Sequence, residues 1–218
     1  MTHTVPMLGR RDLLSFAATA LVAATPWRPA AAEASDDTGA TAPIQQLDAA
    51  LLAAMKAGRG TPFAQRFAGL APVIDQTFDL DAVLAASVGL GWSALPSDQQ
   101  ARLMATFRRY TVASYAANFD SYSGQTFQVS PAVRSVGNGE VVVATKLIPT
   151  DGSATKLDYV MRSGQSGWKV VDVLADGSIS RVAVQRSDFR HVLVNGGAPA
   201  LTVALQQKVA TLSDGVLA

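Results

Sequence analysis

The sequence has no cysteine and only two histidines, and this scarcity removes several kinds of functional site at once. Without cysteine the chain can form neither a disulfide nor a cysteine nucleophile. His3 lies in the apolar N-terminal segment, so His191 is the one histidine in the rest of the chain. A metal site built from histidine and cysteine ligands is therefore excluded, and the fold must be stabilised by its hydrophobic core.

Long hydrophobic runs are also absent, and the most apolar stretch is GRRDLLSFAATALVAATPWRPAAAEAS, residues 9–35. Only residues 13–25 are free of charge and proline, which is short of the roughly 20 apolar residues that a membrane-spanning helix needs. A basic start, a short apolar middle and small residues such as Ala30 and Ala32 are typical of a secretory signal peptide. We therefore expect residues 1–34 to be a cleaved signal that exports the protein to the periplasm.

The start of this segment suggests the export route. Arg10 and Arg11, followed by Asp12 and two leucines, resemble the twin-arginine signal of bacterial proteins that are exported after folding. An ordinary secretory signal that happens to carry two arginines is the alternative.

Strong net charge is missing as well. Loss of Arg10, Arg11, Arg28, Asp12 and Glu33 with the signal leaves 15 basic and 15 acidic residues of the original 18 and 17. Partners such as nucleic acids and anionic membranes are held by a basic surface. Neutrality therefore argues against a nucleic-acid partner.

The first half of the mature chain has helical periodicity. Residues 35–43, SDDTGATAP, are small and polar and predict a flexible leader, so we expect a single domain over residues 44–218. Apolar residues recur at helical spacing in residues 44–58, 61–78, 79–89 and 97–122. The last of these predicted helices is the longest, and its inward stripe includes Phe107, Tyr110, Ser114 and Tyr115.

From Gln125 the period changes to two, which predicts five short strands. They end with SISRVAVQ, residues 178–185, and are separated by the hairpin-type turns GNG, DGS, GQSG and DG. A helix over 187–196 and a last helix from Pro199 follow. This order predicts an α+β domain in which helices pack on one face of a curved antiparallel sheet of about five strands.

Convergent polar groups that could support an enzyme are few. Asp158 and Tyr159 on one predicted strand, with Asp172, Glu140 and His191 as further candidates, leave open a small-molecule enzyme of the cone-shaped, ketosteroid-isomerase-like kind. The alternative for Asp158 is a solvated cross-strand ion pair on the face that carries Arg162. Neither a phosphate-binding glycine loop nor a G-x-S-x-G nucleophile elbow is present.

Two long stretches resemble a known family. They are VGLGWSALPSDQQARLMATFRRYTVASYAANFDSY and LDYVMRSGQSGWKVVDVLADGSISRVAVQRSDFRHVL. Their motifs, in this order and spacing, are similar to the toluene-tolerance or MlaC family of periplasmic phospholipid-binding proteins that serve an ABC transporter. The resemblance covers roughly residues 45–212. Within it, ADGSIS and AVQRSDF look like the hopanoid-associated HpnM branch.

The resemblance implies a function without covalent chemistry, and hence no enzyme and no cofactor. It implies a helix-and-sheet domain with a deep apolar cavity that takes acyl chains, while the head group stays near the mouth. The expected ligand is a phospholipid or a hopanoid. The expected partners of this monomer are lipid-transport proteins of the inner and possibly the outer membrane. A structural accessory with a filled core is the remaining alternative.

The resemblance also suggests which side chains line such a cavity. The candidates share apolar character and positions on predicted inward faces: Phe67, Leu70, Val73, Ile74, Val83, Leu84, Val88, Trp92, Phe107, Tyr110, Tyr115, Tyr159, Val160, Val171 and Val173. Arg162 and Arg186 are candidates for contact with a phosphate, although surface ion pairing is the alternative for both.

Overall fold

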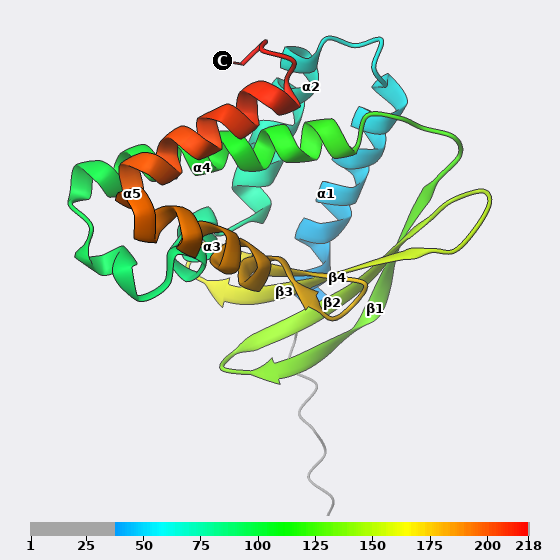
Figure 1. The fold of residues 1–218 in the computed structure, drawn as a ribbon. Coiled ribbons are helices and arrows are strands. Elements are labelled where there is room, and N and C mark those ends of the chain that lie inside the picture. Colours follow the sequence, from blue (N-terminus) through cyan, green and yellow to red (C-terminus); the bar gives the residue numbers. More distant parts are fainter. Residues whose placement is uncertain (1–37, 218) are drawn as a thin grey trace, which may run out of the picture. The chain divides into compact units, whose positions relative to one another are not determined.

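The computed structural model describes residues 38–217, so the predicted signal at residues 1–34 lies outside the described part (Figure 1). Its first half is helical: α1 (Thr38–Ala57), α2 (Phe63–Thr77), α3 (Leu80–Val88), the short 3-10 helix η1 (Gly89–Ala94) and α4 (Ser97–Asn118). Five strands follow: β1 (Thr126–Gly137), β2 (Glu140–Ile148), β3 (Thr155–Gly164), β4 (Gly167–Ala175) and β5 (Ile179–Ser180). Helix α5 (Arg181–Leu212) follows the strands.

The five strands form one antiparallel sheet in the order β1-β2-β3-β4-β5. Each strand pairs with the next in sequence, as the tight turns predict, and Tyr159 of β3 lies opposite Val143 of β2 and Val173 of β4. The helices gather on one face of the sheet, and α1 contacts strands β1 to β4 (Figure 1). The predicted α+β class is confirmed. In the described range, no helix is both long and apolar enough to cross a membrane.

The expected leader at residues 35–43 is wrong from Thr38 onward, because α1 begins there and not at Ile44. Burial explains the difference. Ala40 is completely buried, and a Cβ added at Gly39 would lie 3.3 Å from the Trp168 ring. Small residues, which suggest flexibility in the sequence, here let α1 approach β4 closely.

The fifth predicted strand is too long, because the chain turns helical directly after Ser180. The Ser180 hydroxyl accepts a hydrogen bond from the Ala183 N–H (2.9 Å), and the Asp172 carboxylate accepts one from the Val182 N–H (3.0 Å). These two acceptors satisfy orphan amides of the first turn and start the helix six residues before the predicted cap at Ser187. The predicted break before Pro199 is a kink within α5, where Gly197 has φ +65°.

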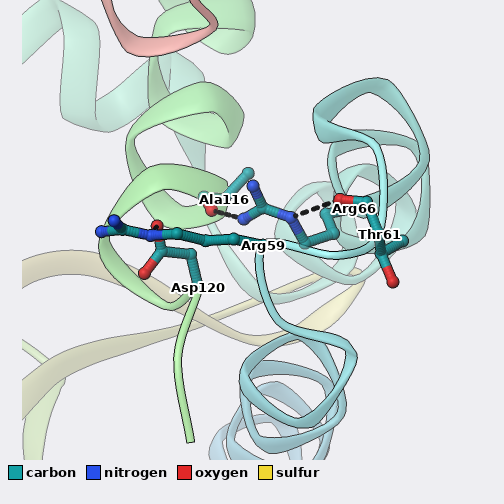
Figure 2. A network of polar contacts seen from close by, with 5 residues as sticks. All are labelled: Arg59, Thr61, Arg66, Ala116 and Asp120. Atoms are coloured by element: carbon teal, nitrogen blue, oxygen red, sulfur yellow. Dashed lines mark hydrogen bonds and ion pairs between the residues drawn. The ribbon is translucent and has the colours of Figure 1, made fainter.

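A buried arginine fixes the end of α4 (Figure 2). The Arg66 guanidinium of α2 donates to the carbonyl of Ala116, in the last turn of α4, and to the carbonyl of Thr61 (3.3 Å). A cation at this position complements the negative end of the helix dipole. Beside it, Arg59 pairs with Asp120 (Nε to Oδ2, 2.7 Å), so the loop after α1 is joined to the segment after α4.

Candidate functional site

A cavity of about 470 Å³ lies between α3, α4, the start of α5 and strands β3 and β4. Ligand pockets commonly have volumes of about 300–1,000 Å³, so this volume suits a small ligand or part of a larger one. The lining residues are Phe78, Leu80, Val83, Phe107, Tyr110, Thr111, Ser114, Tyr115, Asn118, Phe119, Leu157, Tyr159, Asp172, Val173, Ala175, Arg181, Val182 and Gln185.

Helix α4 supplies one wall of the cavity as a stripe at helical spacing. The two aliphatic hydroxyl groups on this stripe turn back to their own helix: Thr111 donates to the Phe107 carbonyl (3.0 Å), and Ser114 donates to the Tyr110 carbonyl (2.8 Å). Since these two hydroxyl protons are already used, this part of the wall presents little unsatisfied polarity to the cavity. Its chemistry is closer to that of an apolar surface than its composition indicates.

The charged groups of the lining behave differently from one another. Asp172 is fully engaged, because its carboxylate accepts from the Ser180 hydroxyl (2.5 Å) and from the amides of Val182 (3.0 Å) and Val173 (2.7 Å). Arg181 is exposed, and its guanidinium has neither an ion pair nor a hydrogen bond to another of residues 38–217. The cavity therefore has one unpaired cation at an exposed edge.

Two tyrosines of the lining, Tyr115 on α4 and Tyr159 on β3, have phenol groups that are largely removed from water. Burial raises the pKa of the Tyr115 hydroxyl, and the positive charge of Arg181 opposes this rise. Burial likewise raises the pKa of Tyr159, whose side chain is almost completely inaccessible. Both phenols are neutral over the physiological pH range and can act only as uncharged hydrogen-bonding groups.

The structure brings together part of the predicted cavity set. The predicted residues in the lining are Val83, Phe107, Tyr110, Tyr115, Tyr159 and Val173. Leu70, Ile74 and Leu84 lie in the core, and Phe67, Val73 and Trp92 pack against it. Val88 lines a separate groove beside α5, Val160 lies half-buried on the outer face of β3, and Val171 is the extra residue of a bulge opposite Val160 and Met161.

Several lining residues are absent from the predicted set, among them Thr111, Ser114 and Val182. The first two lie on the predicted inward stripe of the long helix with Phe107 and Tyr110, but their polarity kept them out of the predicted cavity set. No feature of the sequence indicated Val182 as a cavity residue, because residues 178–185 have the pattern of a strand.

The geometry separates the two leading residues of the enzyme hypothesis, although Asp172, a further candidate, lines the same cavity as Tyr159. Tyr159 lines the cavity, whereas Asp158 is on the other face of β3, in a shallow groove with Lys146 and Lys156. Neighbouring residues of a strand point to opposite faces, so the two side chains cannot serve one substrate. His191 is exposed on α5.

The two arginines proposed for phosphate contact also lie elsewhere. The Arg162 guanidinium pairs with Glu140 across the sheet, at 2.5 Å from Nη2 to Oε1. Arg186 lies against Gly89, where an added Cβ would be 2.8 Å from the guanidinium, and lines the groove that contains Val88. Arg181 is the arginine that lines the main cavity.

The fold and cavity can now be compared with known proteins. The model of the MlaC protein family matches residues 45–207, nearly the whole of the described chain. The chain belongs to the MlaC family. The family resemblance seen in the sequence is thereby confirmed, while assignment to the hopanoid-associated branch stays a prediction.

A solved structure of another protein supports the same fold. It is the phospholipid-binding protein from Ralstonia solanacearum, determined in complex with a phospholipid. The TM-score is 0.69 at 24% sequence identity, over 80% of this chain and 98% of that chain. At this identity the likeness establishes the arrangement of helices and strands, which agrees with the α+β fold described above.

Proposed function

We propose that this MlaC-family protein is a lipid carrier that holds acyl chains in the cavity between α3, α4, α5 and strands β3 and β4. The observation that carries this proposal is a largely apolar cavity with an unpaired arginine at its exposed edge. Such a combination suits a molecule with hydrocarbon chains and an anionic head. Family membership and the phospholipid bound by the Ralstonia solanacearum protein support the proposal.

The energetics favour a carrier that releases its cargo. Burying a methylene contributes about 0.8 kcal/mol, so a lipid gains substantially by leaving water for the cavity. A bilayer offers nearly the same gain. Exchange between the cavity and a membrane is therefore nearly balanced, and partner proteins can set its direction.

Arg181 is the residue that we assign to the head group. It occupies the first position of α5 and lines the cavity, while Asp172 is held by the Val182 amide of the same turn and by the Ser180 hydroxyl. The guanidinium can donate two parallel hydrogen bonds to a phosphate, which gives both charge and orientation. In this arrangement the chains enter the apolar interior and the phosphate stays at the edge.

The proposed cellular location, transport role and cargo of the protein rest on its family membership and on the N-terminal segment. The protein is exported to the periplasm by its signal and shuttles lipid between membrane complexes as an auxiliary protein of an ABC transporter. It acts without catalysis or cofactor. The cargo is a phospholipid, or a hopanoid-type lipid if the branch assignment holds.

The direct test is to identify what the protein carries. The full chain is expressed in a bacterium and purified from the periplasm without detergent, and its organic extract is analysed by mass spectrometry. We expect about one two-chain or polycyclic lipid per protein. Folded protein without stoichiometric lipid would refute the carrier function.

A pair of substitutions on α5 tests the position of the cargo. Val182→Trp fills the cavity, whereas Val203→Trp places the same indole at an exposed position of the same helix. We expect lipid occupancy to fall at least tenfold for the first variant and to stay unchanged for the second. Equal occupancy in both variants would place the lipid elsewhere.

A further inference from the structure

A carboxylic acid lies in the middle of the apolar face of α1. Asp48 has 5% of its surface exposed and follows Ile44 by one helical turn, on the stripe that continues with Leu51 and Met55. Those three neighbours are buried hydrophobic residues. Neither carboxyl oxygen has a hydrogen-bond partner in the part of the chain that the structure describes. Buried polar side chains normally have partners, so this one requires an explanation.

The electrostatics show which other groups are near this carboxyl. A negative charge on Asp48 raises the pKa of Tyr115 and of Tyr159, so the carboxyl is within electrostatic reach of both phenols. Both tyrosines line the cavity, and neither hydroxyl makes a hydrogen bond to another of residues 38–217. The buried carboxyl of Asp48 and two phenols of the cavity lining, all three without partners among residues 38–217, therefore lie within electrostatic reach of one another.

The nature of these groups indicates what they can bind. Burial raises the pKa of Asp48 to about 7, so at neutral pH a large fraction of this carboxyl is uncharged. A neutral carboxyl and a phenol each donate and accept one or more hydrogen bonds. Their best complement is an uncharged group that also donates and accepts, and a hydroxyl group meets this requirement. A cationic head group is a poorer candidate, because the phosphate beside it is drawn to Arg181 at the exposed edge.

We propose that Asp48, together with Tyr115 and Tyr159, recognises a hydroxyl group on the apolar body of the cargo lipid. This inference rests on the proposed carrier function and narrows its substrate class to lipids with a hydroxyl group away from the head. No residue of α1 lines the cavity, so in this proposal the lipid hydroxyl first meets Tyr115 and Tyr159 and reaches Asp48 when the two rings move apart, while both phenols stay beside it. A site built to hydrogen-bond a hydroxyl discriminates strongly against the analogue that lacks it, since its polar groups would stay unpaired.

The experiment is a competition among defined lipids. Delipidated full-length protein is loaded from vesicles of distearoyl phosphatidylcholine mixed with analogues that carry one hydroxyl on one chain, at carbon 2, 6, 10, 12 or 16. The bound lipid is then quantified by mass spectrometry. We expect at least tenfold enrichment of one positional analogue over its share of the vesicle.

The variants assign the enrichment to the site. Asp48→Leu should reduce it to about onefold while uptake of the unhydroxylated lipid persists, and Asp48→Asn, which keeps a donor and an acceptor, should retain most of it. Tyr159→Phe removes a single hydroxyl and should reduce the enrichment several-fold. This variant tests the hydroxyl site if Asp48→Leu fails to fold. Asp158→Leu, the same change on the outer face of β3, is the matched control and should leave the enrichment unchanged.

Three results separate the two proposals. Uptake of distearoyl phosphatidylcholine without enrichment of any analogue overturns the hydroxyl site and leaves the carrier function intact. Enrichment that survives in both Asp48→Leu and Tyr159→Phe also overturns the site. Absence of any lipid uptake, with no lipid in the periplasmic protein, overturns the carrier function and the hydroxyl site together.

Discussion

Helices α1 and α4 both present a continuous inward stripe, but they build different interiors. On α1, Ile44, Leu47 and Leu51 are completely buried and pack against the sheet. On α4, Tyr110 and Tyr115 are half-buried and border the cavity, with the small Ser114 between them in the same stripe. Aliphatic side chains interdigitate and fill space, whereas rigid rings separated by small residues leave a gap. The type of apolar residue, rather than its number, distinguishes the filled region from the hollow one.

The largest expected effect on stability concerns Asp48, the buried polar residue among the aliphatic side chains of α1. Burial raises the pKa of Asp48 from 3.8 to about 7, so between these pH values the folded state keeps a proton that the unfolded chain has lost. Stability therefore falls as pH rises through this window, by on the order of 4 kcal/mol, and this contribution is constant above it. Asp48→Leu removes this dependence and should raise the free energy of unfolding at pH 8.

Urea unfolding followed by tryptophan fluorescence at pH 4.5 and pH 8 measures this effect. The stability difference between Asp48→Leu and the parent protein should grow more favourable to the variant from the lower to the higher pH. A difference of equal size at both pH values would show that Asp48 does not hold a proton in the folded state.

A somewhat smaller effect tests the contrast in packing directly. Leu47→Ala should lower the free energy of unfolding by about 3 kcal/mol, because it opens a new void in a filled region. Val173→Ala, at a residue that already borders the cavity, should cost only about 1 kcal/mol, which is mainly the lost transfer energy. Denaturant unfolding of both variants gives the comparison, and equal costs would mean that the two regions are packed alike.

The smallest expected effect concerns the ion pair that joins α4, which borders the cavity, to α2. Arg108 of α4 pairs with Asp75 of α2 (Nη2 to Oδ2, 2.5 Å), with both side chains partly exposed. The hydrogen-bonded carboxylate raises the pKa of Arg108, but water screens such pairs. A double-mutant cycle of Arg108→Ala and Asp75→Ala should give a coupling below about 1 kcal/mol. A coupling of several kcal/mol would indicate that the pair clamps α2 to α4.

Sequence periodicity predicted most of the helices and strands. It failed where small residues pack against the sheet and where capping side chains start a helix. The stripe of α4 was predicted together with its aromatic and hydroxyl residues, because a long amphipathic helix carries a local signal. The start of α1 was missed, since Ala40 and Gly39 owe their helical state to contact with the sheet. The segment after Ser180 was predicted as a strand, because the capping role of Asp172 depends on a partner ten residues away.

The site could be predicted only in part. Residues such as Phe107 and Tyr159 were found through the family resemblance, but Ile74 and Leu84, of the same apolar character, fill the core instead. Asp48 was overlooked, although its spacing one turn after Ile44 places a carboxyl on an apolar face. That spacing was the available sequence signal. Only the structure shows that the Asp48 carboxyl is buried, which makes it a candidate binding group.

By itself the sequence determined the order of helices and strands, the antiparallel pairing of neighbours and the family, because these depend on local periodicity, turn residues and motif order. The tertiary structure alone decided where the interior stays hollow, that Arg181 is the arginine at its edge and that the buried Asp48 carboxyl has no hydrogen-bond partner among residues 38–217. These features arise from side chains that are distant in the sequence and meet only when α1, α4 and α5 pack on the sheet. No local pattern encodes the space left between them.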